Sequence, residues 1–193
     1  MHLSKLAIPL VKASTFFGDK VYMAMALELL DKAKQLQDID GGFRINESSN
    51  VIMTHPHCYA TEGLLYAYHT SKRGVFLDTA KKSAAWLSRV QNPDGSFYLS
   101  YGTEKKAEHR DMQEETKATD STAQATRIWK LLCVNQTGIK KAYEYLDSEL
   151  NGNGLRLYRI ESMRRSIHSW PTFFYIHSLM LPFGQMGYSG ELF

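Results

Sequence analysis

The chain alternates two kinds of segment with apolar residues at helical spacing. Three segments carry an apolar stripe opposite a lysine- and glutamate-rich face and close on a glycine-containing turn, and they span residues 19–46, 74–102 and 139–160. Four others are apolar around most of their circumference, and they span residues 2–17, 55–69, 120–134 and 168–181. A helix that is apolar all round has to be covered on all sides. We therefore expect the four to form an inner layer of helices and the three an outer layer.

The glycine-containing turns repeat one pattern. Two of them read Gln-x-x-Asp-Gly-x-Phe and end at Phe43 and Phe97, 54 residues apart, and a fainter third copy places Leu155 another 58 residues on. Glycine enters the left-handed backbone region at no steric cost, so we expect it to stop each outer helix before a short extended segment. Three copies of one unit predict an all-α array of helical hairpins that forms a single domain over residues 1–193.

Composition narrows the classes of function. The net charge of +3 arises from 23 basic and 20 acidic residues without a long run of one sign, so nucleic acid is not an expected partner. No stretch approaches 18 consecutive apolar residues, and the N-terminus lacks the apolar core of a signal peptide. We therefore expect a cytoplasmic protein without a membrane-spanning segment, in which both cysteines are reduced.

Ionisable side chains recur where the inner helices are expected to begin. The four starts read His2, His55 with His57, Asp120, and His168. Helix N-termini favour anions, which suits Asp120 to an ionised role. Further along, Gln124 and Arg127 share a helical face with Asp120, and Glu62 shares a face with Tyr59. These residues are the candidates for a functional site.

The alternation of helices and the Gln-x-x-Asp-Gly-x-Phe endings resemble the (α/α) toroids. This group includes six-hairpin glycosidases with related sugar lyases and epimerases, and also prenyltransferases and terpene cyclases. The stretches Thr-His-Pro-His-Cys-Tyr-Ala-Thr-Glu and Asp-Ser-Thr-Ala-Gln-Ala-Thr-Arg are more similar to the six-hairpin carbohydrate-active group. Six hairpins at this period would take about 320 residues. The chain therefore resembles the C-terminal half or more of a toroid, a truncated paralogue, or one part of a ring that another chain completes.

The resemblance implies a saccharide ligand in the funnel where the inner helices begin, and no cofactor. It implies catalytic roles for Asp120 and Glu62. It implies saccharide contacts from His55, His57, Tyr59, Gln124, Arg127, His168, Trp170 and Arg110. Glycoside hydrolysis needs two carboxyl groups, whereas lyases and epimerases use His, Tyr or Arg around a uronate. Both kinds of reaction stay open.

Other roles stay open for the same residues. Asp120 beside Ser121 is also a good helix N-cap, and Glu62 paired with Arg127 would be a structural ion pair. The His-Pro-His-Cys segment lacks the spacing of zinc ligands, so no metal is expected. A prenyltransferase- or terpene-cyclase-like toroid is an alternative, although Ala-Thr-Asp-Ser-Thr-Ala keeps one aspartate of the aspartate-rich motif. A non-catalytic binding or scaffold module is a second alternative.

Two further expectations concern the surface. Residues 102–119 carry many charges and no apolar periodicity, so we expect a loop that enters at Asp120. It would act as a lid in which His109 and Arg110 meet an acidic sugar, or it would be a plain solvated connector. An open array also leaves apolar flanks on its first and last hairpins, so we expect self-association unless further N-terminal hairpins cover them.

Overall fold

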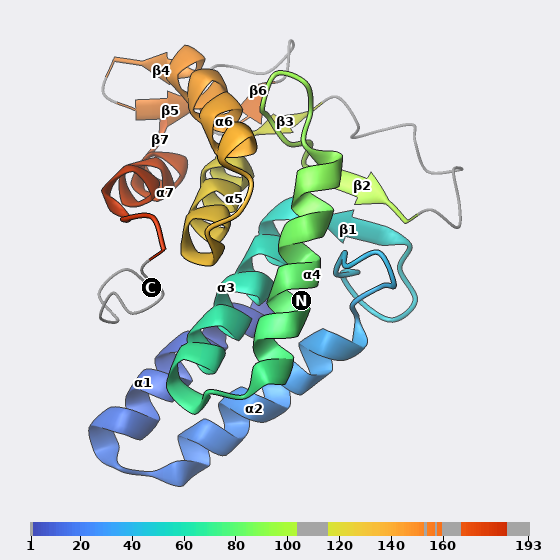
Figure 1. The fold of residues 1–193 in the computed structure, drawn as a ribbon, viewed down its shortest axis with the longest axis vertical. Helices are drawn as coiled ribbons and strands as arrows, with labels where there is room; N and C mark the ends of the chain where they lie inside the picture. The colour runs from blue at the N-terminus through green and yellow to red at the C-terminus, as the bar shows by residue number, and fades with distance from the viewer. Residues whose placement is uncertain (1, 104–115, 153, 157, 160–166, 185–193) are drawn as a thin grey trace.

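The computed structural model describes residues 2–103, 116–152, 154–156, 158–159 and 167–184, and it consists mainly of helical hairpins (Figure 1). The helical elements are the 3-10 turn η1 (His2–Leu6), α1 (Ala7–Phe17), α2 (Lys20–Gln35), α3 (Thr54–Ser71), α4 (Gly74–Val90), α5 (Thr119–Leu132), α6 (Gln136–Ser148) and α7 (Ser169–Met180). Consecutive helices α1 and α2, α3 and α4, and α5 and α6 pack against each other as hairpins. Within the described residues, no helix is long and apolar enough to cross a membrane.

Short antiparallel strands lie at one end of the hairpins. They are β1 (Val51–Met53), β2 (Ser100–Gly102), β3 (Lys117–Ala118), β4 (Leu150–Asn151), β5 (Gly154–Arg156), β6 (Tyr158–Arg159) and β7 (Ile167–His168). Strand β1 pairs with β2, β3 with β6, and β5 with both β4 and β7. Strands β1, β3 and β7 lead directly into α3, α5 and α7. The pairings β1–β2, β3–β6 and β5–β7 therefore tie the start of an inner helix to the segment that follows an outer helix, while β4 and β5 form a hairpin after α6.

The helices form the two layers that the hydrophobic pattern predicts. Neighbouring inner elements contact one another in the order η1, α3, α5 and α7, while α2, α4 and α6 lie outside them (Figure 1). Helices α3 and α5 are buried on almost every side. The core between the layers contains Phe43, Phe97 and Leu155, the three residues that end the repeated turns, and none of them is exposed. The all-α toroid-like fold class is confirmed.

The glycines of the turns do not stop the outer helices, so that part of the expectation is wrong. Helices α2 and α4 end at Gln35 and Val90, and the left-handed Gly41 and Gly95 lie several residues further on. A Cβ at Gly95 would stand 2.3 Å from the backbone carbonyl carbon of a residue in α6, and one at Gly41 would meet the backbone of α4 at 2.3 Å. These turns need glycine because the chain there is pressed against the next outer helix.

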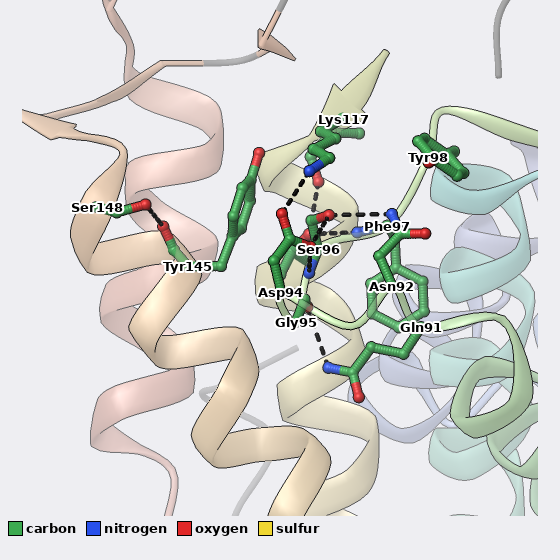
Figure 2. Close-up of polar contacts among 12 residues, drawn as sticks. Gln91, Asn92, Asp94, Gly95, Ser96, Phe97, Tyr98, Lys117, Tyr145 and Ser148 are labelled. Carbon is green, nitrogen blue, oxygen red and sulfur yellow. Dashed lines mark hydrogen bonds and ion pairs between the residues drawn. The ribbon is translucent and has the colours of Figure 1, made fainter. Parts of the chain in front are cut away.

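A glutamine in each of these two turns joins it to the next outer helix. The Gln91 carboxamide donates a hydrogen bond to the carbonyl of Gly95 at 3.0 Å (Figure 2). It donates a second one to the carbonyl of Gly138, in α6, at 2.9 Å. Gln37 makes the equivalent bonds to Gly41 and to Thr79 of α4. Asp94 accepts from the Ser96 backbone, as the sequence predicts for an aspartate that supports the turn.

Another set of hydrogen bonds joins the turns to the inner helices. In each case a backbone N–H at the end of the turn donates to the fourth residue of an inner helix. The pairs are Phe43 to His57 Nδ1 at 3.2 Å, Phe97 to Thr122 Oγ1 at 3.2 Å, and Leu155 to Thr172 Oγ1 at 2.9 Å. These bonds fix the rotation of α3, α5 and α7 about their axes, and therefore decide which side chains face the inside.

Candidate functional site

Helices α3, α5 and α7 begin in the same way, so their residues can be compared position by position. They start at Thr54, Thr119 and Ser169, each directly after a strand. The second, sixth and ninth residues of a helix share one face, because they are separated by four and three positions. His55 lies against Asp120 and Trp170, the Tyr59 ring lies near that of Phe174, and Glu62 pairs with Arg127, so the three positions form three successive layers. Gln124 and His177 belong to the second and third layers by their positions in α5 and α7.

The first layer contains His55, Asp120 and Trp170, the second residues of the three helices. The Nδ1 atom of His55 lies 2.9 Å from Oδ2 of Asp120, and the imidazole and indole ring centroids are 6.0 Å apart. Asp120 is 5% exposed, whereas Trp170 is 49% exposed. The layer therefore combines a sheltered carboxylate–imidazole pair with an indole that is open to solvent.

Asp120 uses its two carboxylate oxygens differently. Oδ1 accepts from the backbone N–H of Ser121 at 2.6 Å and so satisfies one of the free N–H groups at the start of α5, while Oδ2 faces His55. The N-cap of α5 is Ala118, so the expectation that Asp120 caps the helix is wrong. Its position as the second residue leaves one oxygen directed toward the neighbouring inner helix.

The second layer contains Tyr59, Gln124 and Phe174. The ammonium of Lys5, which comes from η1, lies 4.1 Å from the centre of the Tyr59 ring and 4.8 Å from that of Phe174. Burial, followed by the charges of Glu62 and other neighbours, raises the pKa of the Tyr59 phenol, which is therefore neutral. This layer is mainly aromatic, and the guanidinium of Arg127, from the third layer, also lies 5.4 Å from the centre of the Phe174 ring.

The third layer contains Glu62, Arg127 and His177. Glu62 is fully buried, and its carboxylate lies 3.0 Å from Nη1 of Arg127 and 3.6 Å from Nζ of Lys5. The pKa of His177 is lowered by burial and then by the charge of Arg127. The structural ion pair that the sequence left open for Glu62 and Arg127 is present. The catalytic role expected for Glu62 stays a prediction.

His57 lies outside these layers. Its side chain is fully buried, Nδ1 accepts from Phe43, and Nε2 lies 2.8 Å from Oγ of Ser83. Burial lowers the pKa of this imidazole to about 3, so it is neutral and carries its proton on Nε2. Both ring nitrogens serve the packing of a turn against α3 and α4. The geometry gives His57 a structural role in place of the saccharide contact expected from the sequence.

Seven of the ten predicted site residues occupy positions in these layers. They are Asp120, Glu62, His55, Tyr59, Gln124, Arg127 and Trp170. The sequence suggested that His168 begins an inner helix, and this is wrong. His168 belongs to strand β7, where it pairs with Leu155 of β5. The second position of α7 is Trp170. The side chains of His2 and His168, and all of His109 and Arg110 with the lid expected there, lie outside the described residues.

Sequence reasoning missed Lys5, Phe174 and His177. Phe174 and His177 follow Trp170 at i+4 and i+7, so the spacing that grouped Asp120 with Arg127 would have found them. Lys5 had no such signal, because residues 2–17 read as one helix and Lys5 belongs to a separate 3-10 turn. Side chains of a 3-10 turn repeat every three residues and therefore point in other directions than those of an α-helix.

The first layer has the groups needed for proton transfer beside an aromatic platform. A carboxylate held by an imidazole can exchange a proton with a ligand, and an exposed indole can stack on the apolar face of a sugar ring. Among the described residues, no group of three or more His, Cys, Asp or Glu side chains is placed to hold a metal ion. A surface groove of about 560 Å³ lies elsewhere, between the end of α2 and residues 45–48.

The fold and these layers define the class of structure: the chain has the fold of part of an (α/α) toroid. No protein-family model and no curated protein matches the chain. Solved structures of similar fold include the unsaturated glucuronyl hydrolase of Bacillus sp. GL1, with a TM-score of 0.65 and 13% identity. They also include the GH76A α-1,6-mannanase of Salegentibacter sp. HEL1_6, with a TM-score of 0.61 and 17% identity. A family 76 glycoside hydrolase from a bovine Bacteroides thetaiotaomicron strain gives 0.57 and 18%.

The chain is much shorter than these enzymes. The match to the glucuronyl hydrolase covers 90% of this chain and 55% of that one, and the match to the mannanase covers 78% and 48%. For the Bacteroides enzyme the shares are 74% and 33%. The chain therefore spans between a third and somewhat over half of the length of the toroids that it resembles.

Proposed function

We propose that the chain is a carbohydrate-active toroid segment that binds a saccharide at the first layer, where Asp120 exchanges a proton with the ligand. The observation that carries this proposal is the meeting of His55, Asp120 and Trp170 at the N-terminal ends of three successive inner helices. These residues come from separate repeats, and none is needed to build the turns. The solved structures of similar fold support the proposal, because they include an α-1,6-mannanase and an unsaturated glucuronyl hydrolase.

The roles of the three residues follow from their surroundings. The indole of Trp170 is half exposed and edge-on to Phe174, so its free face stacks on the ligand. Asp120 lies beside it and donates a proton to, or accepts one from, an oxygen of the bound sugar. His55 holds the carboxylate through Nδ1 and leaves its second ring nitrogen for a ligand hydroxyl. Because hydrolysis usually needs two carboxyl groups, a second one would have to act with Asp120.

Calorimetry with α-1,6-mannotetraose and with a glucuronate-containing disaccharide tests binding, and product analysis tests turnover. Binding of either sugar by the wild type is expected, with loss on Trp170→Ala. Asp120→Asn is expected to abolish turnover while the melting temperature stays close to that of the wild type. Asp78→Asn, which changes an exposed carboxylate on α4, is the matched control. Binding without turnover would favour the non-catalytic module, and no binding of any saccharide would overturn the proposal.

Glu62→Gln separates the two roles left for Glu62. Its carboxylate is the partner of the buried Arg127 and the partly buried Lys5, so the variant is expected to lose stability on the order of 3 to 5 kcal/mol. Thermal unfolding measures this change. A Glu62→Gln protein that melts like the wild type but has no turnover would instead make Glu62 a catalytic residue.

A further inference from the structure

The positive charge of Lys5 has few hydrogen-bond acceptors around it. Its only polar contact among the described residues is Oε2 of Glu62, at 3.6 Å, and the same carboxylate lies closer to Arg127. The ammonium also lies over the ring faces of Tyr59 and Phe174, at 4.1 and 4.8 Å from their centres. An ammonium has three N–H donors and loses hydration in such a place. Burial accordingly lowers the pKa of Lys5, in spite of the nearby carboxylate.

Gln124 is a second unsatisfied group in the same layer. Its side chain is fully buried, and neither its carboxamide nitrogen nor its oxygen has a hydrogen-bond partner in the part of the chain that the structure describes. Helix α5 packs between α3 and α7, and Gln124 takes the position that Tyr59 has in α3 and Phe174 has in α7. Since Lys5 lies over both of those rings, its ammonium and the Gln124 carboxamide belong to one level of the funnel.

Unpaired donors in a sheltered site are costly unless a ligand pairs with them. The Lys5 ammonium and the amide group of Gln124 both donate hydrogen bonds, and a carboxylate is the small group that accepts from both and also neutralises the ammonium. The rings of Tyr59 and Phe174 keep this level apolar, which strengthens a charge-assisted hydrogen bond. The position lies one helical turn below Asp120.

We propose that Lys5 and Gln124 form a subsite for the carboxylate of an acidic sugar. The subsite rests on the proposed function, because it selects among saccharides bound at the first layer. A neutral sugar offers no anionic acceptor to the ammonium and the amide N–H of Gln124, whereas the carboxylate of a uronic acid accepts hydrogen bonds from both. The 29% exposure of the Lys5 side chain gives the ligand access to the ammonium.

The test compares two ligands that differ only at the carboxyl group. Calorimetry at fixed ionic strength measures the affinity for a glucuronate-containing disaccharide and for its carboxyl-reduced counterpart. The wild type is expected to prefer the acidic disaccharide by tenfold or more, as expected for a lost charge-assisted hydrogen bond. Equal affinities in the wild type would overturn the subsite, and this comparison depends on no variant.

Lys5→Met and Gln124→Leu assign the preference to these residues. Lys5→Met keeps the length of the side chain and leaves Glu62 paired with Arg127, so the protein is expected to fold. Both variants are expected to lose the preference, so that their affinities for the acidic and the carboxyl-reduced disaccharide become equal. Lys32→Met, at an exposed lysine of α2, is the control for net charge.

The outcomes separate the subsite from the function on which it rests. Binding of both disaccharides without a preference, or a preference that survives in Lys5→Met, would overturn the subsite and leave the proposed function standing. Failure of the wild type to bind any saccharide would overturn both. An equal loss of preference in Lys32→Met would show that overall charge, and no particular lysine, favours the acidic ligand.

Discussion

At the scale of single residues, His55 and His57 show how position on a helix decides a role. They stand two residues apart, which places them on nearly opposite sides of α3 because each residue turns the helix by about 100°. His55 faces Asp120, whereas His57 faces the outer layer and accepts the hydrogen bond that Thr122 and Thr172 accept in the next two inner helices. The sequence shows two histidines at a helix start. Residues three or four positions apart share a helical face, and this spacing joins His55, but not His57, to Tyr59 and Glu62.

The buried His57 is expected to make stability depend on pH. Its pKa is about 3 in the folded chain and 6.5 in the unfolded chain. Between these pH values the imidazole is protonated in the unfolded state and neutral in the folded state. The stability that the neutral imidazole contributes is therefore present above pH 6.5 and is lost as the pH falls toward 3, by about 1.4 kcal/mol per pH unit. Chemical denaturation between pH 5 and 6.5 measures this slope.

His57→Thr supplies the comparison, because it introduces the side chain found at the equivalent positions of α5 and α7. The variant is expected to be less stable at pH 7, by about 2 to 4 kcal/mol for the lost ring contacts. Its stability should change less between pH 5 and 6.5 than that of the wild type. Equal slopes in the two proteins would show that other groups cause the pH dependence.

At the scale of elements, the turns after α2 and α4 hold neighbouring hairpins together. The sequence predicts their glycines and their left-handed backbone, and both are present at Gly41 and Gly95. It does not show that the glycines pack on the next outer helix, because that contact joins residues more than 40 positions apart and leaves no periodic signal. The layers of the site share this property. Each helix supplies a regular face, but the strand pairings and the hydrogen bonds to His57, Thr122 and Thr172 set one face opposite another, and both join distant parts of the chain.

Gly95→Ala is expected to destabilise the chain strongly. The added Cβ would lie 2.1 Å from the backbone oxygen of Lys141, a contact that requires α4 and α6 to move apart. Gly18→Ala is the matched control, because Gly18 also has a positive φ, of +69°, but nothing lies within 4 Å of its added Cβ. Gly18→Ala therefore reports the backbone strain alone, on the order of 1 kcal/mol. Thermal unfolding of both variants measures the difference. An equal loss of stability in the two would show that the contact of Gly95 with α6 does not matter.

The sequence does not determine which residue begins α7. His168, Ser169 and Trp170 are equally plausible first residues of an inner helix, because a proline follows and apolar residues continue beyond it. The pairing of Leu155 with His168 decides the matter by placing His168 in β7. Without that pairing, the indole that completes the first layer could not be aligned with His55 and Asp120.

At the scale of the whole molecule, the described hairpins form an arc with two apolar flanks. Helix α7 exposes apolar side chains three and four residues apart, at Phe173, Ile176 and Met180. The first hairpin exposes its own set at the other flank, namely Leu6, Phe16, Phe17, Val21 and Met25. In the longer toroids of similar fold, more chain is available to surround such helices. Both the fold and the apolar flanks follow from patterns that the sequence displays, whereas what covers the flanks does not.

The isolated 193-residue chain is therefore expected to self-associate through these flanks. Contact between them would remove large apolar side chains from water, at about 25 cal/mol for each Å² buried. Light scattering at high micromolar concentration should give a mass above the 22.0 kDa of one chain. Ile176→Asp, on the exposed face of α7, should shift the population toward the monomer, whereas Val75→Asp, at an exposed apolar position of α4, should not. A wild-type chain that stays monomeric at that concentration would contradict the expectation, since an unshielded surface of this kind would then be stable in water.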